Sequence, residues 1–134
     1  MSAVKAIRAL LVAHAPVAAI VGQRIYAGLV PEGSPYPILY IGEVSRTERL
    51  TTSLTGSSVL VMARVQVTAI TRSYAECKAL LQAARLDAGA HTGVIAGVTV
   101  RSITRQPIGP DFYDADVKTF EQSRDFMIVF TEEN

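Results

Sequence analysis

The amino-acid sequence predicts an α+β fold: a largely antiparallel sheet of about four strands, with helices packed on one face, in the order α-β-β-α-β-β. Apolar side chains recur at helical spacing in two segments, and they alternate at strand spacing in residues 36–44, 59–71, 98–105 and 121–131. Loops separate the strands of each pair, which favours antiparallel hairpins. The 134 residues, of which 49% are hydrophobic, suit a single domain spanning 1–134.

The chain opens with a predicted helix over residues 3–13. Its apolar stripe repeats at helical spacing and consists of Ala3, Ile7, Leu10 and Leu11, with His14 at its end. Residues 16–21 are interpreted as a second short helix, because proline is tolerated in a first helical turn and Gly22 can end the helix.

The first pair of strands consists of residues 36–44 and 59–71. The second of these gives the longest strand signal, because one side of it is wholly apolar, with Val59, Val61, Ala63, Val65, Val67 and Ala69. Residues 45–58 are polar, rich in Thr and Ser, and predicted as a loop. Residues 107–118 are predicted as a second polar loop, which joins the strands of the second pair.

A third helix is predicted after residue 73. Ser73 and Glu76 have the spacing of a capping box, in which both side chains bind backbone N–H groups that the first helical turn leaves free. The apolar positions Cys77, Leu80, Leu81, Ala84 and Ala88 then follow at helical spacing, and Gly89 is predicted to end the helix.

The histidines and the cysteine form no pattern that indicates catalysis. His14 and His91 are the only histidines, and neither has Asp, Glu or Cys nearby at metal-ligand spacing. Cys77 is alone, so it forms no intrachain disulfide, and it lies on the predicted core face of its helix, where a thiol behaves as a small hydrophobe. We therefore expect no catalytic residue, no cofactor and no metal site.

The acidic loop and the glycines near residue 90 are the other candidates for ligand binding. The acidic side chains Asp111, Asp114, Asp116 and Glu121 do not have the spacing of a calcium loop, and a solvated loop explains them. Gly89, Gly93 and Gly97 follow a helix instead of connecting a strand to a helix, which is the wrong context for phosphate binding.

Overall charge indicates no preferred partner. The formal net charge is +1, so the whole chain has little electrostatic attraction to nucleic acid or to a membrane surface. Arginines near strand ends and loops either contact nucleic acid or an acidic partner, or are simply solvated: Arg46, Arg49, Arg72, Arg101 and Arg105. The longest apolar run is well short of the roughly 20 residues that span a bilayer, so we expect a soluble protein made in the cytoplasm.

The last predicted strand is apolar on both sides. Phe126, Ile128 and Phe130 alternate with Met127 and Val129. A two-layer domain of this size covers only one face of its sheet, so the other face needs a helix of this chain or another subunit. We favour subunit contact.

Short segments spread over nearly the whole chain occur in a specific order. They are AIRALL (6–11), V-G-x-R-I-Y (21–26), P-x-G (31–33), PI (37–38), RVQV (64–67), SYAE (73–76), GVTV (97–100) and SRDFMI (123–128). Together they resemble the bacteriophage tail-completion family, whose members are also described as tail terminator or tail-to-head joining proteins. Such proteins occur in long-tailed phages, prophages and gene transfer agents.

This resemblance implies a non-enzymatic α+β subunit that needs no cofactor and closes into a homo-oligomeric ring, typically a hexamer. Such a ring caps the tail tube, terminates tail growth and joins the tail to the head. The implied partners are further copies of the chain, the tail-tube protein and the head–tail connector or neck protein. DNA would pass through the lumen without sequence-specific binding, and no membrane is involved. The implied location is the tail–neck region of the virion, after assembly in the host cytoplasm.

The candidate contact residues come from the polar loops and the two-faced strand: Arg46, Arg49, Asp111, Asp114, Met127 and Val129. Two other classes of function stay open. Another ring component of the same virion, such as a tail-tube subunit or head–tail adaptor, is distinguished by open-ended polymerisation. A small-molecule-binding or enzymatic α+β domain is distinguished by a stable monomer or dimer with a polar pocket.

Overall fold

The computed structural model describes residues 2–49, 58–86 and 91–133. Its helices and strands follow in the order α1 (Ser2–Ala13), α2 (Ala15–Val21), β1 (Ile25–Ala27), β2 (Ile38–Arg49), β3 (Ser58–Thr71), α3 (Tyr74–Ala83), β4 (Gly93–Ile95), β5 (Val98–Ile108), β6 (Phe112–Asp114) and β7 (Thr119–Glu133). The predicted α+β class is confirmed, and so is the short second helix that ends at Gly22.

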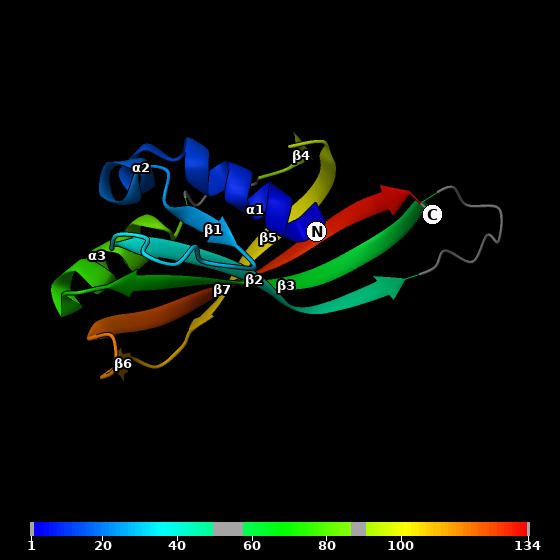
Figure 1. Ribbon diagram of the computed structural model, residues 1–134. Coiled ribbons are helices and arrows are strands. Elements are labelled where there is room, and N and C mark those ends of the chain that lie inside the picture. The colour runs from blue at the N-terminus through cyan, green and yellow to red at the C-terminus, as the bar shows by residue number, and fades with distance from the viewer. Residues whose placement is uncertain (1, 50–57, 87–90, 134) are drawn as a thin grey trace.

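The strands form one sheet in the order β1-β2-β3-β7-β5-β4, and β6 pairs with β7 beyond the end of β5. The pair β1–β2 is parallel, and the other pairs are antiparallel. Each residue of β3 has a partner in β7, from the pair Ser58–Glu133 to the pair Thr71–Phe120. The long strands β2, β3 and β7 extend past α1 at one end of the molecule (Figure 1).

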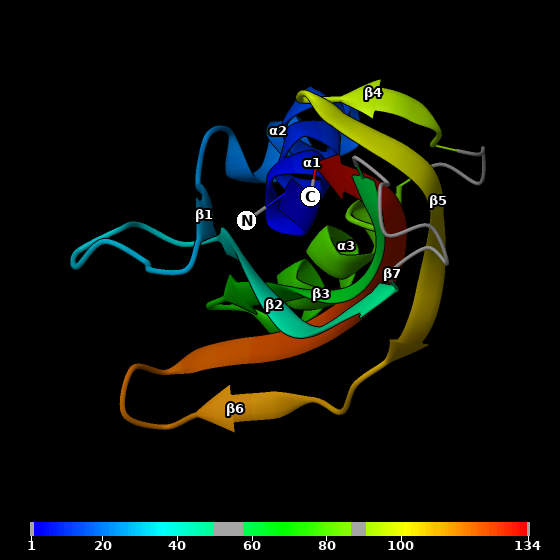
Figure 2. The same cartoon turned by 90° about the vertical axis from the view of Figure 1, so that its right-hand side faces the viewer.

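The sheet curls around the helices, so it has a concave and a convex face (Figure 2). The described helices α1, α2 and α3 all lie on the concave side, which confirms the predicted packing on one face. In β3 and β7 most of the concave side chains are buried apolar residues: Val59, Val61, Ala63, Val65, Val67, Ala69, Phe126, Ile128 and Phe130. Helix side chains complete this core, among them Ile7 and Leu11 of α1 and Leu80 and Leu81 of α3.

The predictions of about four strands and of the order α-β-β-α-β-β are wrong, because β1, β4 and β6 are additional strands of 3 residues each. Segments this short carry no recognisable period, and they form because longer strands offer free edges. β4 joins β5 through a two-residue turn in which Ala96 and Gly97 have φ values of 51° and 82°. Positive φ at both central residues is typical of the type I′ turn, which matches the twist of a hairpin.

Both predicted polar loops are shorter than expected. β2 continues through residues 45–49, because each of these residues pairs with β3 although its side chain is polar. Residues 50–57 of the first loop lie outside the described residues. In the second loop, β5 extends to Ile108, and residues 112–114 form β6.

The third helix begins as predicted but ends earlier. The Ser73 hydroxyl accepts a hydrogen bond from the backbone N–H of Glu76 at 3.5 Å, as a capping residue does. The helix ends at Ala83, and Leu86 has a left-handed φ of 61°, so the prediction that it continues to Gly89 is wrong. Ala88 and Gly89 lie outside the described residues.

Within the described ranges, no single helix is long and apolar enough to cross a membrane. Helices α1 and α2 reach that length and composition only as a pair, and a bend of 85° separates them. In this structure α1 packs on the sheet and buries Ala3, Ala6, Ile7 and Leu11.

Candidate assembly surfaces

The convex face of the sheet is the side that no described helix covers (Figure 2). In β3 and β7 its side chains alternate with the buried ones of the core. An apolar part near the start of β3, here called the convex strip, consists of the half-buried side chains of Leu60, Met62, Met127 and Val129. The convex strip is apolar surface on the outside of the domain, where burial by another protein would be favourable.

Met127 and Val129, two of the predicted contact residues, lie together on the convex strip. Met127 is paired with Arg64 of β3, and Val129 is paired with Met62. The prediction that this strand is apolar on both sides is confirmed, because Phe126, Ile128 and Phe130 are buried on the concave face. A helix over the convex face was the alternative cover, and none of the described helices lies there.

Beside the convex strip, an ion pair joins β3 to β7. Nε of Arg64 lies 2.5 Å from Oδ2 of Asp125, whose side chain is only 6% exposed, whereas that of Arg64 is 44% exposed. The hydroxyls of Thr68 and Ser123, 2.9 Å apart, continue the polar surface along the same two strands. On β3 the convex face is therefore apolar near the start, polar at Arg64 and Thr68, and apolar again at the half-buried Ile70.

Arg46 and Arg49 lie in the last part of β2, which ends at Arg49. Arg46 binds Glu132 at 2.7 Å and Glu48 at 3.0 Å, and its guanidinium carbon is 5.7 Å from the centre of the Phe130 ring. The hydrogen bond with Glu132 is the main cause of a raised Arg46 pKa. Arg46 therefore already has partners within the chain, whereas Arg49 is exposed at the strand end.

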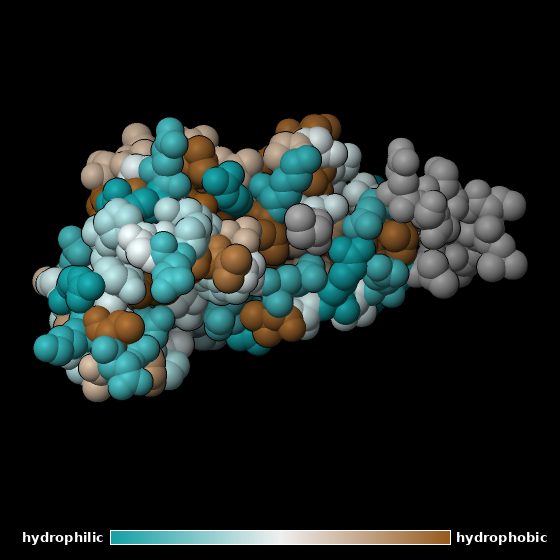
Figure 3. Space-filling view, viewed as in Figure 1, coloured by the Kyte–Doolittle hydropathy of each residue, from teal (hydrophilic) through white to brown (hydrophobic). Residues whose placement is uncertain are grey.

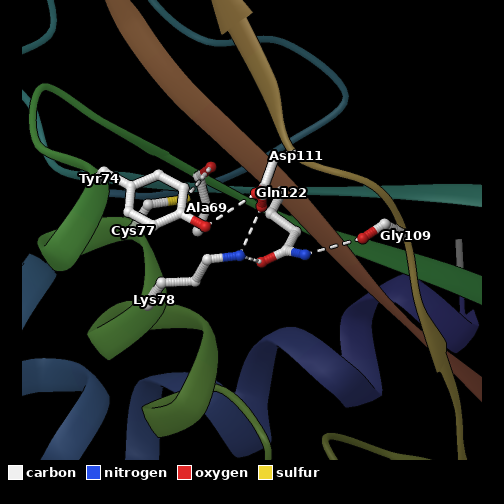
Figure 4. Close-up of polar contacts among 7 residues, drawn as sticks. All are labelled: Ala69, Tyr74, Cys77, Lys78, Gly109, Asp111 and Gln122. Atoms are coloured by element: carbon white, nitrogen blue, oxygen red, sulfur yellow. Dashed lines mark hydrogen bonds and ion pairs between the residues drawn. The ribbon is translucent and has the colours of Figure 1, made fainter.

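Asp111, another predicted contact residue, belongs to a network that joins α3 to the strands (Figure 4). It accepts hydrogen bonds from the Lys78 ammonium group and, at 2.9 Å, from the Tyr74 hydroxyl. Lys78 also donates to Gln122 of β7 at 2.7 Å, and the Gln122 amide donates to the Gly109 carbonyl at 2.8 Å. These five residues are here called the α3–β7 network. Arg46 and Asp111 thus lie towards opposite ends of the sheet, each in contacts of its own.

The other acidic residues of the predicted cluster, Asp114, Asp116 and Glu121, are not members of the α3–β7 network. Oδ1 of Asp114 accepts a hydrogen bond from the backbone N–H of Asp116 at 3.0 Å, which holds the turn between β6 and β7. Glu121 is half-buried, and burial raises its pKa, with the charge of Asp114 adding to the effect. Across the described residues, no three His, Cys, Asp or Glu side chains are grouped as potential metal ligands.

A second apolar surface lies around β6, and the sequence analysis missed it. Its exposed side chains are Ile108, Phe112, Tyr113 and Val117. The ring of Tyr113 stacks against Phe120 of β7 with a centroid distance of 4.8 Å. Figure 3 shows a hydrophobic side chain at the surface among hydrophilic ones in this part of the molecule. The adjacent aromatic residues Phe112 and Tyr113 could have indicated this surface in the sequence, because a purely polar loop would not contain two large apolar rings.

His14 and Cys77 have structural positions. His14 is half-buried and precedes α2 in an extended conformation, without a hydrogen bond from its side chain to the helix. Cys77 is buried as predicted, and its thiol lies 3.7 Å from the carbonyl oxygen of Ala69 (Figure 4). Burial raises the pKa of the Cys77 thiol, which disfavours the thiolate that a nucleophile requires.

Comparisons with known proteins add family information to this geometry. A solved structure described as the virion of a native gene transfer agent particle contains a chain that superposes with a TM-score of 0.69. The sequence identity is 19%, and the match covers 98% of this chain and 95% of the other, so the two share a fold. A comparison with curated proteins finds no match. The family model of the tail completion protein gp17 matches residues 5–131, and this protein therefore belongs to that family.

Proposed function

We propose that this protein forms a ring that caps the phage tail tube, terminates tail growth and joins the tail to the head. Membership of the tail completion family over residues 5–131 carries this proposal and supports a structural protein of a phage tail. The shared fold with a chain of a gene transfer agent virion supports a place in the particle. The ring is typically a hexamer, and its place is the neck, between the last ring of the tube and the head connector.

The proposed mechanism is geometric. One face of the ring binds the end of the tube and blocks further addition, and the other face binds the connector or neck protein. DNA passes through the lumen without sequence-specific contacts. The net charge of +1 agrees with this, because a protein that bound DNA tightly would need an excess of basic residues.

The convex strip is the best candidate for contact between subunits. Arg46 and Asp111 have partners within the chain. To bind a neighbour, each would have to exchange one ion pair for another, which would add little to the free energy of association. Met127 and Val129 would instead lose contact with water, which contributes about 25 cal/mol for each Å² of apolar surface buried. Burial of the whole strip therefore favours association without breaking any contact of the monomer.

Light scattering coupled to size exclusion tests the ring across a concentration series. The proposal expects a discrete species of ring mass, or a monomer that forms this species when tail tubes are added. Open-ended polymers would instead indicate a tail-tube subunit. A monomer that responds neither to concentration nor to tubes would contradict the proposal.

Two sets of variants locate the contact surface. Met127→Gln with Val129→Thr makes the convex strip polar at nearly constant volume, and we expect at least a tenfold loss of association in light scattering. Val94→Thr is the matched control, because Val94 is an exposed valine on the edge strand β4. A quadruple alanine variant of Arg46, Arg49, Asp111 and Asp114 tests the charged candidates, and normal assembly would remove these four residues from the proposed interface.

A further inference from the structure

A small pocket lies beside the α3–β7 network, between α3 and the strands β5 and β7. Its lining combines polar and apolar residues: Lys78, Leu81 and Gln82 of α3, Ile108 of β5, Gly109, and Gln122 and Arg124 of β7. Figure 4 shows that Lys78 and Gln122 approach each other from facing elements at this place. The pocket therefore has walls whose positions are fixed by hydrogen bonds between the helix and the sheet.

Arg124 is the unusual residue of this pocket. It lies on the concave face of β7, two residues before Phe126, and only 6% of it is exposed. Its Nε has no hydrogen-bond partner among the described residues. A buried N–H group without a partner costs free energy, because it loses its hydration and gains no compensating hydrogen bond. This cost would be relieved by an anion that enters the pocket.

The charges around the pocket favour an anion. Burial lowers the pKa of Arg124, and the positive charges of Arg105 and Arg85 lower it further, so the electrostatic surroundings of its guanidinium are positive. Lys78 adds a fourth positive charge at the rim, where Asp111 neutralises it. The titratable groups that face Arg124 thus leave an excess of positive charge.

We propose that this pocket binds a carboxylate group of a neighbouring protein subunit in the assembled tail, with the Arg124 guanidinium as its main partner. The inference rests on the proposed assembly into a ring. A planar guanidinium matches a carboxylate in two parallel hydrogen bonds. The Asp111 carboxylate at the rim disfavours a doubly charged phosphate more than a singly charged carboxylate, so an Asp or Glu side chain is the occupant that fits the surrounding charge.

Nuclear magnetic resonance of the arginine Nε–H groups tests carboxylate binding in the full chain. A hexaglutamate peptide is titrated in one series and inorganic phosphate in another, and the Arg124 signal is followed. We expect a saturable shift with the peptide that is absent in Arg124→Met and unchanged in Arg101→Met, a control at an exposed position on β5. No shift with the peptide, or saturation by phosphate alone, would overturn the proposal.

A second measurement separates the pocket from the fold and from the ring. Methionine fills a volume similar to that of arginine without its charge, so Arg124→Met is expected to melt at or above the wild-type temperature and to associate at least tenfold more weakly. A variant that melts well below wild type would overturn the view that the Arg124 Nε–H is buried without a partner. Normal association of the variant would overturn the pocket's role and leave the ring proposal standing. A wild-type chain that never associates would count against the ring, whereas the peptide titration would still decide whether the pocket binds carboxylates.

Discussion

The two faces of β3 and β7 differ although they belong to the same strands. On the concave face, Val65 pairs with Phe126, and both are buried under the helices. The adjacent pair, Arg64 of β3 with Met127 of β7, lies on the convex face, and both side chains keep contact with solvent. The concave face supplies most of the core, whereas the side chains of Arg64 and Met127 on the convex face are accessible to other molecules.

The largest expected difference between the faces comes from adjacent residues of β7. Phe126→Ala removes a fully buried aromatic ring from the core and should cost about 3–5 kcal/mol of unfolding free energy. Met127→Ala removes a half-buried side chain from the convex strip and should cost less than about 1 kcal/mol. Urea denaturation of both variants measures these costs. Equal costs would mean that the convex face is as important for the monomer as the core.

A smaller effect is expected at the ion pair of the convex face. Arg64→Met leaves the buried Asp125 carboxylate without its partner, and we expect a loss of about 1–3 kcal/mol, with the exposure of Arg64 favouring the lower end. Asp125→Asn removes the charge from the same pair. A double-mutant cycle of the two substitutions in urea denaturation measures their coupling. Additive effects would contradict the pairing.

The smallest effect is expected where a helix of the concave side meets the strands, at Lys78 and Asp111. Hydrogen bonding to Lys78, and then to Tyr74, lowers the Asp111 pKa from its ordinary 3.8, so this stabilisation is present above that pH and is lost as the pH falls through the lower folded value. Hydrogen bonding to Asp111 raises the Lys78 pKa from 10.5, so that contribution is present below pH 10.5 and is lost as the pH rises through the higher folded value.

Lys78→Met should therefore lower the melting temperature slightly near neutral pH. The difference from wild type should shrink in strong acid and in strong alkali. Melting curves across the pH range, with Lys5→Met in the exposed part of α1 as the control, measure this difference. A difference that does not change with pH would show that the side chain acts through packing.

The sequence by itself determined the elements whose signal is local. The alternation of Val and Ala from 59 to 69 predicted the core face of β3, and the Ser73–Glu76 spacing predicted the start of α3. The stripe of α1 was also predicted, because a helix that packs on a sheet must repeat its apolar residues every three or four positions. The order of short segments along the whole chain was sufficient to indicate the family.

Only the tertiary structure decided the features that depend on pairing between distant residues. β1, β4 and β6 exist because β2, β5 and β7 offer free edges, and the polar residues 45–49 extend β2 because β3 runs beside them. The partners of Arg64 and Lys78 lie 61 and 33 residues away, distances at which spacing carries no information. The position of Arg124 follows the alternation of its strand, but the burial of its Nε without a hydrogen-bond partner depends on how α3 and β5 pack around it. Long-range packing therefore decided which charged side chains find partners within the chain.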